Sequence, residues 1–207
     1  TIVAASGDAG APSRVNEGCT DAPFGTHLNP IFPGSSPYVV SVGATVVAAA
    51  DPLGDAAPPA CAGQRCAGLV TGEAACSLGS HGCIFTGGGG FAWFSPRPWY
   101  QDTAAYLKAA SQPNRSEFNA AGRGYPDVAA LGHNYLVKYE GDWQSVDGTS
   151  ASAPVVASLL TGINGVLEAA GRPRVGFWPP VLHRLGAECP DCFHDVTEGT
   201  NACTEYA

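Results

Sequence analysis

Ser150 stands in the string VDGTSASAPVVASLL (146–160), between a glycine and the start of a long apolar run. Gly148 permits a tight turn because it has no Cβ, and the apolar run predicts a buried helix. A hydroxyl on the first turn of a helix lies near unpaired N–H groups and the positive end of the helix dipole, which stabilise an oxyanion. The alternative is that Thr149 or Ser150 only caps the helix. The small residues of GTSASAP favour a nucleophilic serine, because bulky side chains there would block an approaching peptide.

A carboxylate near the amino end is the second chemical feature. Asp8 lies in the string SGDAG, directly after the apolar run TIVAAS (1–6). An Asp that follows a buried parallel strand lies at the carboxyl edge of the sheet, where the active sites of α/β proteins collect. An Asp between glycines also commonly bonds its own backbone in a turn. The position alone therefore leaves both roles open.

The elements that must position these residues alternate between strand and helix patterns. TIVAAS and SPYVVSVGATVVAA (36–49) predict strands, and the second is rich in β-branched residues, as in a strand buried on both faces of a parallel sheet. YPDVAAL and NYLVKYEG predict short strands. A short helix is predicted over 101–110 and a long one over 151–171, which a glycine and a proline terminate. This alternation predicts an α/β fold with a mostly parallel sheet.

The cysteines indicate a disulfide framework formed in an oxidising compartment, since there are eight in 207 residues. Residues 50–85 carry four of them among Pro, Gly and Ala, and are interpreted as a surface insertion pinned by disulfides. CPDC (189–192) is a C-x-x-C, but no second pair follows with the spacing of a zinc site. Asn114 begins a glycosylation sequon, which agrees with a secretory route. The cysteines are Cys19, Cys61, Cys66, Cys76, Cys83, Cys189, Cys192 and Cys203.

Composition excludes several classes of partner. The net charge is −8, and only ten Lys and Arg are present, whereas phosphate binding needs clustered cations. Nucleic acid and anionic membranes are therefore not expected as partners. No apolar run is long enough to predict a membrane span. The chain begins within a predicted strand and stops without a turn signal, so it is expected to be a fragment or a processed chain.

Strings in a fixed order resemble one family. They are SGDAG, FPGSSPYVVSVGAT (32–45), GGGF (88–91) with PRPWYQ (96–101), GRGYPDVAAL (122–131), GTSASAP, GFWPPVLH (176–183) and FHDVTEGTN (193–201). Together they resemble the sedolisin family of serine-carboxyl peptidases in the subtilisin-like clan, and most of all its tripeptidyl peptidase I branch. The matches cover nearly all of the chain apart from 50–85. The resemblance implies a subtilisin-like, three-layer α/β fold, incomplete at both ends, with residues 1–207 forming the C-terminal portion of a peptidase catalytic domain.

The resemblance also implies roles for single residues. Ser150 would form the acyl-enzyme and Asp8 would contribute to the oxyanion hole, where a protonated carboxyl at acid pH donates a hydrogen bond to developing negative charge. The family's general base is a Glu, with an Asp one helical turn away, upstream of the SGD motif and therefore outside this chain. The chain alone is expected to be inactive. Asp127 in YPDVAA is assigned a structural role at the start of a strand.

No group within the chain replaces that base convincingly. His27 in GTHLNP is similar to the subtilisin histidine motif, but it follows the SGD string instead of preceding it. The remaining carboxylates considered lie in polar loops and are expected to be solvated; they are Glu17, Glu117, Glu140 and Asp147.

The resemblance further implies a calcium site, and the positions of the cysteines, among 105 possible pairings, lead us to expect certain bridges. Asp195 and the backbone carbonyl of Val196 match the first two ligands of the family's single Ca²⁺ site, and oxygen ligands are what this hard cation requires. The other ligands would lie beyond Ala207, and a turn or cap role for Asp195 is an equal alternative. Bridges are expected within 61–83, between Cys189 and Cys192, and between Cys19 and Cys203.

The leading interpretation is an acid serine peptidase, secreted or lysosomal/vacuolar, that acts on peptides or unfolded proteins as a tripeptidyl peptidase or an endopeptidase. Its catalytic partner would be the upstream part of its own chain or a pro-segment. Two alternatives remain. One is a subtilisin with a Ser-His-Asp triad, whose oxyanion residue is normally Asn, so that Asp8 favours the sedolisin. The other is a secreted, disulfide-stapled binding module without catalysis.

Overall fold

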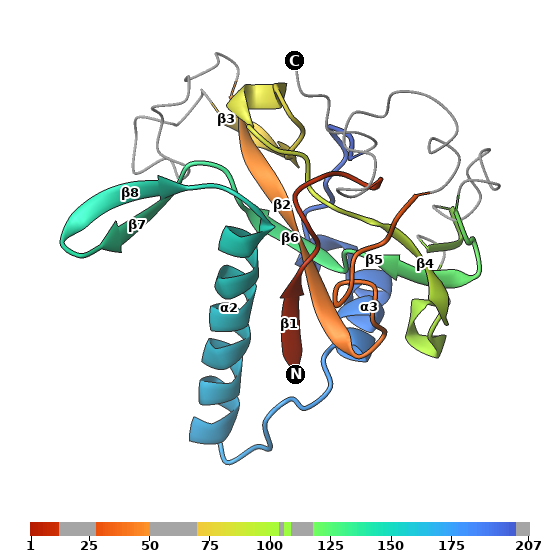
Figure 1. Ribbon diagram of the computed structural model, residues 1–207. Helices are drawn as coiled ribbons and strands as arrows, with labels where there is room; N and C mark the ends of the chain where they lie inside the picture. Colours follow the sequence, from red (N-terminus) through yellow and green to blue (C-terminus); the bar gives the residue numbers. More distant parts are fainter. Residues whose placement is uncertain (13–27, 50–69, 104–105, 109–117, 202–207) are drawn as a thin grey trace.

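The sheet is organised around one long strand, β2 (Val39–Ala49). It pairs in parallel with β1 (Ile2–Ala5) and β6 (Val128–Leu131), and antiparallel with β3 (Val70–Ala75) (Figure 1). The sheet is therefore mostly parallel, as the sequence predicts. The computed structural model describes residues 1–12, 28–49, 70–103, 106–108 and 118–201.

The register of the parallel strands brings their carboxyl ends to one edge. β1 runs beside residues 39–42 of β2 and β6 beside residues 42–45, so both strands point toward the same edge and β6 ends three residues farther along β2 than β1 does. The side chains of Val40 and Val42 are fully buried. Ser6, directly after β1, and Gly132, directly after β6, then leave the sheet close to β2, since Ser6 N donates to Val42 O and Gly132 N to Thr45 O.

Two helices pack on one face of this sheet. α2 (Thr149–Ala169) contacts β1, β2 and β6, and α3 (Pro179–Glu188) contributes Leu182 to the same apolar cluster (Figure 1). The apolar cluster between helices and sheet consists of Val40, Val42, Val156, Leu160, Trp178 and Leu182. The described residues thus show the sheet and one helical layer of the expected three-layer arrangement.

One helix among the described residues, α2, is long and apolar enough to cross a membrane by length and composition alone. Its buried residues include Thr149, Ser152, Val156 and Leu160. These lie on the side that contacts the sheet, whereas Leu159 and Val166 are exposed. α2 therefore packs one side against the sheet and leaves the other side exposed among the described residues.

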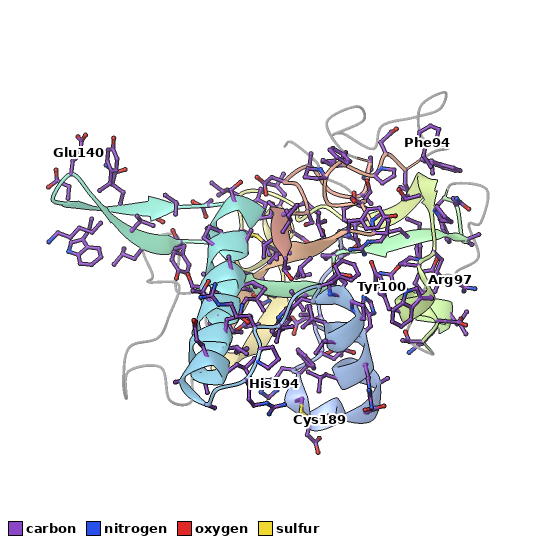
Figure 2. All side chains as sticks on the ribbon, turned by 90° about the horizontal axis from the view of Figure 1, so that it is seen from below. Phe94, Arg97, Tyr100, Glu140, Cys189 and His194 are labelled. Atoms are coloured by element: carbon purple, nitrogen blue, oxygen red, sulfur yellow. A yellow bond between two sulfur atoms is a disulfide. The ribbon has the colours of Figure 1, made fainter. Side chains whose placement is uncertain are left out.

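Two antiparallel ribbons flank the sheet. β4 (Gly90–Pro96) pairs with β5 (Gly122–Tyr125), and β7 (Tyr135–Tyr139) pairs with β8 (Asp142–Val146). The β7–β8 hairpin projects away from the sheet (Figure 1) and carries Glu140 at its far end (Figure 2). Three short 3₁₀ turns complete the described elements: η3 (Ser80–Gly82), η4 (Trp99–Gln101) and η5 (Pro190–Cys192).

A fully buried ion pair links β5 to the bend that leads into β6, and α3 contacts it through His183. The side chains of Arg123 and Asp127 are 0% exposed, and Arg123 Nη2 donates to Asp127 Oδ2 over 2.6 Å. The same carboxylate accepts from the backbone N–H of Ser41 (2.7 Å), and its Oδ1 accepts from Nε2 of His183 (2.9 Å). Burial alone would raise the pKa of Asp127, but the His183 hydrogen bond, the charge and hydrogen bond of Arg123 and the Ser41 N–H together lower it. The structural role assigned to Asp127 is thus to neutralise a buried arginine beside β2.

The predicted elements correspond to observed ones at most positions. The strands predicted over 1–6 and 36–49 are β1 and β2, and the helix predicted over 151–171 is α2. Within the insertion predicted over 50–85, residues 70–75 differ from a surface loop, because as β3 they pair with β2. Residues 50–69 and part of the helix predicted over 101–110 lie outside the described residues.

Two disulfides join described cysteines. Cys189 pairs with Cys192, as expected, and Cys76 pairs with Cys83 within the region where local bridges were expected. Cys189 lies at the end of α3, near His194 (Figure 2). The pairings predicted for Cys19, Cys61, Cys66 and Cys203 lie outside the described residues, as does Asn114.

Candidate active site

Ser150 is an exposed residue on the first turn of α2. The chain leaves β8 at Val146, turns through Asp147 and Gly148, and enters the helix at Thr149. Gly148 has φ +123°, a conformation that residues with a Cβ rarely adopt. The glycine before the serine is therefore required by the turn that presents Ser150, as the sequence predicts.

Asp8 lies directly beside this turn. Its Oδ1 accepts two hydrogen bonds, one from the backbone N–H of Thr149 and one from the Thr149 hydroxyl, both over 2.7 Å. Thr149 Oγ1 in turn accepts from the backbone N–H of Gly7 (3.2 Å). The structure thus brings Asp8 and Ser150 together, although they are 142 positions apart in the sequence. The Asp8 carboxylate is bonded to Thr149, the residue directly before Ser150.

Some backbone N–H groups of the first turn of α2 donate hydrogen bonds to described residues, and one does not. Thr149 N donates to Asp8, and Ala151 N donates to Gly148 O over 2.9 Å. Within the part of the chain that the structure describes, no hydrogen bond uses the N–H of Ser150. This donor, at the positive end of the α2 dipole, is available to an oxyanion next to the serine.

The start of α2 is fixed to the end of β6. Gly148 N donates to Gly132 O (2.8 Å), and the buried hydroxyl of Ser152 donates to the carbonyls of Ala130 (2.8 Å) and Leu131 (3.1 Å). A Cβ on Gly132 would lie 2.5 Å from Ser152 Oγ, so only glycine allows this approach. The serine turn is therefore held by the carboxyl ends of both β1 and β6.

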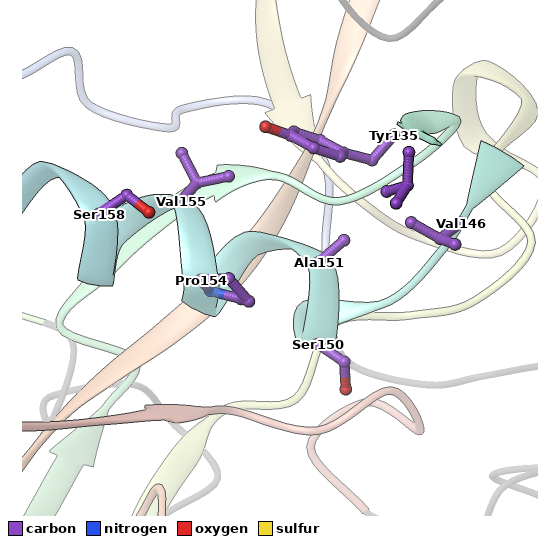
Figure 3. A pocket seen from close by; sticks show the side chains of 8 residues that line it. Tyr135, Val146, Ser150, Ala151, Pro154, Val155 and Ser158 are labelled. Carbon is purple, nitrogen blue, oxygen red and sulfur yellow. The ribbon is translucent and has the colours of Figure 1, made fainter. Parts of the chain in front are cut away.

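A pocket of about 330 Å³ opens beside Ser150 between α2 and the base of the β7–β8 hairpin (Figure 3). Its wall is mainly apolar and contains no His, Asp or Glu among the described residues. The general base that a serine nucleophile needs is thus not supplied by this wall. The lining residues are Tyr135, Val137, Val146, Ser150, Ala151, Pro154, Val155 and Ser158.

Asp147 differs from the solvated carboxylate that the sequence suggests. Its side chain is 21% exposed, and its Oδ1 lies 2.5 Å from Nδ1 of His133, whose side chain is 6% exposed. Sequence reasoning missed His133, although it follows the predicted strand that ends near residue 131, at the edge where site residues of parallel sheets collect. Glu140 is exposed at the hairpin tip, as expected, and His27, Glu17 and Glu117 lie outside the described residues.

The residues proposed for calcium lie away from this constellation in the chain, after η5. Asp195 and Val196 are exposed. Among the described residues no cluster of three or more His, Cys, Asp or Glu could hold a metal ion. The Asp195 carboxylate and the Val196 carbonyl are the oxygen ligands that Ca²⁺ prefers. The cation takes about six to eight oxygens, so these two residues alone do not complete a site.

Comparison with known proteins gives the same picture. Residues 1–173 match the model of the family described as the subtilase family. The chain belongs to the subtilase family. Within it, this subtilase chain is 42% identical to physarolisin of Physarum polycephalum, 35% to tripeptidyl-peptidase 1 of Homo sapiens and 34% to tripeptidyl-peptidase SED2 of Arthroderma otae.

The match covers 99–100% of the subtilase chain but only 29–36% of those three relatives, so the chain spans about a third of their length. Among solved structures, a Pseudomonas sedolisin, a serine-carboxyl proteinase complexed with two molecules of pseudo-iodotyrostatin, aligns with a TM-score of 0.67 at 22% identity. That alignment covers 98% of this chain and 47% of the sedolisin chain. The predicted sedolisin-like resemblance and subtilisin-like fold are thus confirmed.

Proposed function

We propose that the full-length protein is a serine peptidase of the sedolisin type, with Ser150 as nucleophile and Asp8 in the oxyanion hole. The observation that carries the proposal is the double hydrogen bond from Thr149 to Asp8 Oδ1, which fixes a carboxylate beside the serine turn. The whole-chain similarity to physarolisin and the tripeptidyl peptidases supports it.

The geometry supports a definite division of roles. Ser150 Oγ attacks the carbonyl carbon of the scissile bond, and its proton passes to a base outside the described residues. Because Asp8 Oδ1 already accepts two hydrogen bonds, the proton of a neutral Asp8 resides on Oδ2. Oδ2–H and the N–H of Ser150 then donate to the tetrahedral oxyanion. The leaving amine takes the proton from the base, and water later releases the acyl group from Ser150.

A Ser-His-Asp triad built from His133 and Asp147 does not fit this geometry. His133 Nδ1 contacts Asp147, as in a triad, but its Nε2 lies 3.0 Å from the side-chain nitrogen of Asn134. No described hydrogen bond joins His133 to Ser150. A carboxylate beside the serine, instead of an asparagine, also favours the sedolisin chemistry over the subtilisin alternative.

The proposal is tested by peptide hydrolysis with the full-length protein. Ser150→Ala should reduce kcat by at least three orders of magnitude, because the nucleophile is lost. Thr161→Ala removes an exposed hydroxyl from the same helix and serves as the matched control. The pH–rate profile should have an acid maximum that decays toward neutrality, as a protonated Asp8 requires.

Other outcomes of this experiment separate the alternatives. Undiminished hydrolysis by Ser150→Ala would remove Ser150 from the reaction. A neutral-to-alkaline maximum would point to a histidine base and a subtilisin mechanism. A folded full-length protein that cleaves no peptide at any pH would indicate the binding module.

We propose peptides and unfolded proteins as substrates, with release of tripeptides from free N-termini as one mode and internal cleavage as the other. The names of two relatives, tripeptidyl-peptidase 1 and SED2, favour the first mode. A peptide substrate with a free amino end, compared with the same peptide acetylated, separates them. Cleavage of the free form alone indicates the exopeptidase, and equal cleavage of both indicates an endopeptidase.

We propose a secretory or lysosomal/vacuolar route, since the disulfides Cys76–Cys83 and Cys189–Cys192 form and persist in oxidising compartments. We also propose that the upstream part of the same polypeptide, or a pro-segment, completes the site. The absence of ionisable groups other than the Tyr135 phenol from the described wall of the Ser150 pocket supports this, because the base must then come from elsewhere.

We further propose that Asp195 and the Val196 carbonyl contribute to a calcium site that other parts of the full-length protein complete. Calcium should raise the thermal midpoint of the full-length protein, because a ligand that binds only the native state stabilises it. Asp195→Asn should remove this dependence, and Asp191→Asn, at a nearby exposed carboxylate, should retain it. An Asp195→Asn protein that responds to calcium like the wild type would contradict the assignment.

A further inference from the structure

Two loops contact each other at Asp147, three residues before Ser150. One connects β6 to β7 and contains His133 and Asn134; the other connects β8 to α2 and contains Asp147. Asp147 Oδ1 is the shared acceptor between them, 2.5 Å from His133 Nδ1 and 3.0 Å from the backbone N–H of Asn134. The backbone bond from Gly148 N to Gly132 O lies next to this contact in the sequence of both loops.

The pair is shielded from water, with 6% of the His133 side chain and 21% of the Asp147 side chain exposed. A charge-assisted hydrogen bond in such surroundings is stronger and better oriented than one at the surface. The β7–β8 hairpin has its own ladder from Tyr135–Val146 to Tyr139–Asp142 and does not depend on it. What the pair restrains is the turn from Asp147 into α2.

We propose that His133 is a positioning residue for Ser150. By holding the Asp147 carboxylate, His133 sets the direction in which the chain enters the Gly148 turn. The Gly148 turn directs the N–H and hydroxyl of Thr149 toward Asp8. It also directs the hydroxyl and N–H of Ser150 toward the side where the substrate binds. This inference rests on the proposed function, and it adds a histidine that acts through Asp147 and never exchanges a proton with the substrate.

The neighbours of the imidazole explain why it is not the base. In the neutral ring, Nδ1–H donates to Asp147 and Nε2 accepts from Asn134 Nδ2, while Asn134 Oδ1 accepts from the Ser145 hydroxyl over 2.9 Å. Both ring nitrogens are thus engaged within the two loops. The essential group is the Nδ1 donor, and this makes a sharp choice of variants possible.

Asparagine and glutamine separate the two ring nitrogens. In His133→Asn the amide nitrogen takes about the place of Nδ1 and keeps the donor to Asp147, whereas in His133→Gln it takes about the place of Nε2. His133→Ala removes both. Lys138→Ala, on the exposed part of the same hairpin, is the matched control, because its side chain lies over the Trp143 ring and away from the pair.

The experiment measures kcat, KM and the rate of Ser150 labelling by a fluorophosphonate in the full-length protein, with thermal midpoints to show the folded state. His133→Ala and His133→Gln should lower kcat and the labelling rate by roughly 10- to 100-fold, since a displacement of about 1 Å can cost about 100-fold, with KM changed less than about twofold. His133→Asn should recover most of both rates, and Lys138→Ala should match the wild type.

The other results each overturn the idea. Wild-type kcat in His133→Ala would show that the pair positions nothing. A folded His133→Asn as slow as His133→Ala would show that the imidazole exchanges protons. If the lost rate equals the lost folded fraction in every variant, the role is purely structural. A wild-type protein without Ser150-dependent hydrolysis would instead refute the proposed function itself.

Discussion

Replacing Asp127 by asparagine removes one negative charge from its buried contact with Arg123 of β5 and His183 of α3. The guanidinium of Arg123, which is 0% exposed, then keeps its charge without a counter-charge. The asparagine also presents an N–H to a site that held two oxygens, each facing donors from Arg123, Ser41 or His183. Breaking one half of such a buried pair costs about 3–5 kcal/mol in free energy of unfolding.

The measurement is the thermal midpoint of the full-length protein with and without Asp127→Asn. For a domain of about 150–250 residues, 1 kcal/mol corresponds to about 2–4 °C and to less in a larger one, so in the full-length protein the midpoint should fall by up to roughly 6–20 °C. The control is Glu168→Gln, which breaks a pair with Arg174 whose side chains are 62% and 69% exposed. A pair of that kind contributes about 0–1 kcal/mol, so the control should shift the midpoint by only a few degrees.

The pH dependence gives the sign of the electrostatic contribution. Since the pKa of Asp127 is lower in the folded state, its stabilisation is fully present above the unfolded value of about 3.9 and is lost as the pH falls through the folded value. The gap between wild type and Asp127→Asn should therefore remain constant between about pH 7 and 5, and close only below about pH 4. A gap that closes near neutrality, or a shift no larger than that of Glu168→Gln, would refute the reasoning.

Two further substitutions test the serine turn in the full-length protein. Gly148→Ala places a Cβ on a residue with φ +123°, 3.0 Å from Asp8 Oδ2. We expect the free energy of unfolding to fall by roughly 1–3 kcal/mol and kcat to decrease. A kcat equal to that of the wild type would contradict the need for glycine in this turn. Ser152→Ala removes the hydroxyl that donates to Ala130 O and Leu131 O, and should cost about 1–2 kcal/mol in the same assay with KM unchanged. An unaltered midpoint would show that these bonds do not hold the helix.

The proximity of Asp8 and Ser150 could be anticipated from the sequence, because a strand-to-loop Asp and a helix-opening serine both belong at the carboxyl edge of a parallel sheet. The long strand β2 and the helix α2 could also be anticipated, since their apolar patterns are continuous and well terminated. Asp147 was misjudged because its partner, His133, is 14 positions away and becomes a neighbour only through the β7–β8 hairpin. Local polarity indicates solvent exposure unless the topology supplies a partner.

The buried pair illustrates the same limit at longer range. Charged residues four positions apart are usually solvent-exposed, yet Arg123, on β5, and Asp127, in the bend between β5 and β6, are both fully buried. The third member, His183, comes from α3, 56 positions further along. Spacing cannot reveal such a contact, because it depends on how the last helix packs against the sheet.

The bond between Asp8 and Thr149 also has a consequence in time. The two residues are 141 positions apart in the sequence. At a synthesis rate of about 5–20 residues per second, Thr149 is therefore made roughly 7–28 s after Asp8. During that interval the nascent chain contains the SGD loop but no serine turn beside it. Because α2 can pack only after it has been synthesised, the candidate active site is not assembled while the earlier part of the chain is still unfolded.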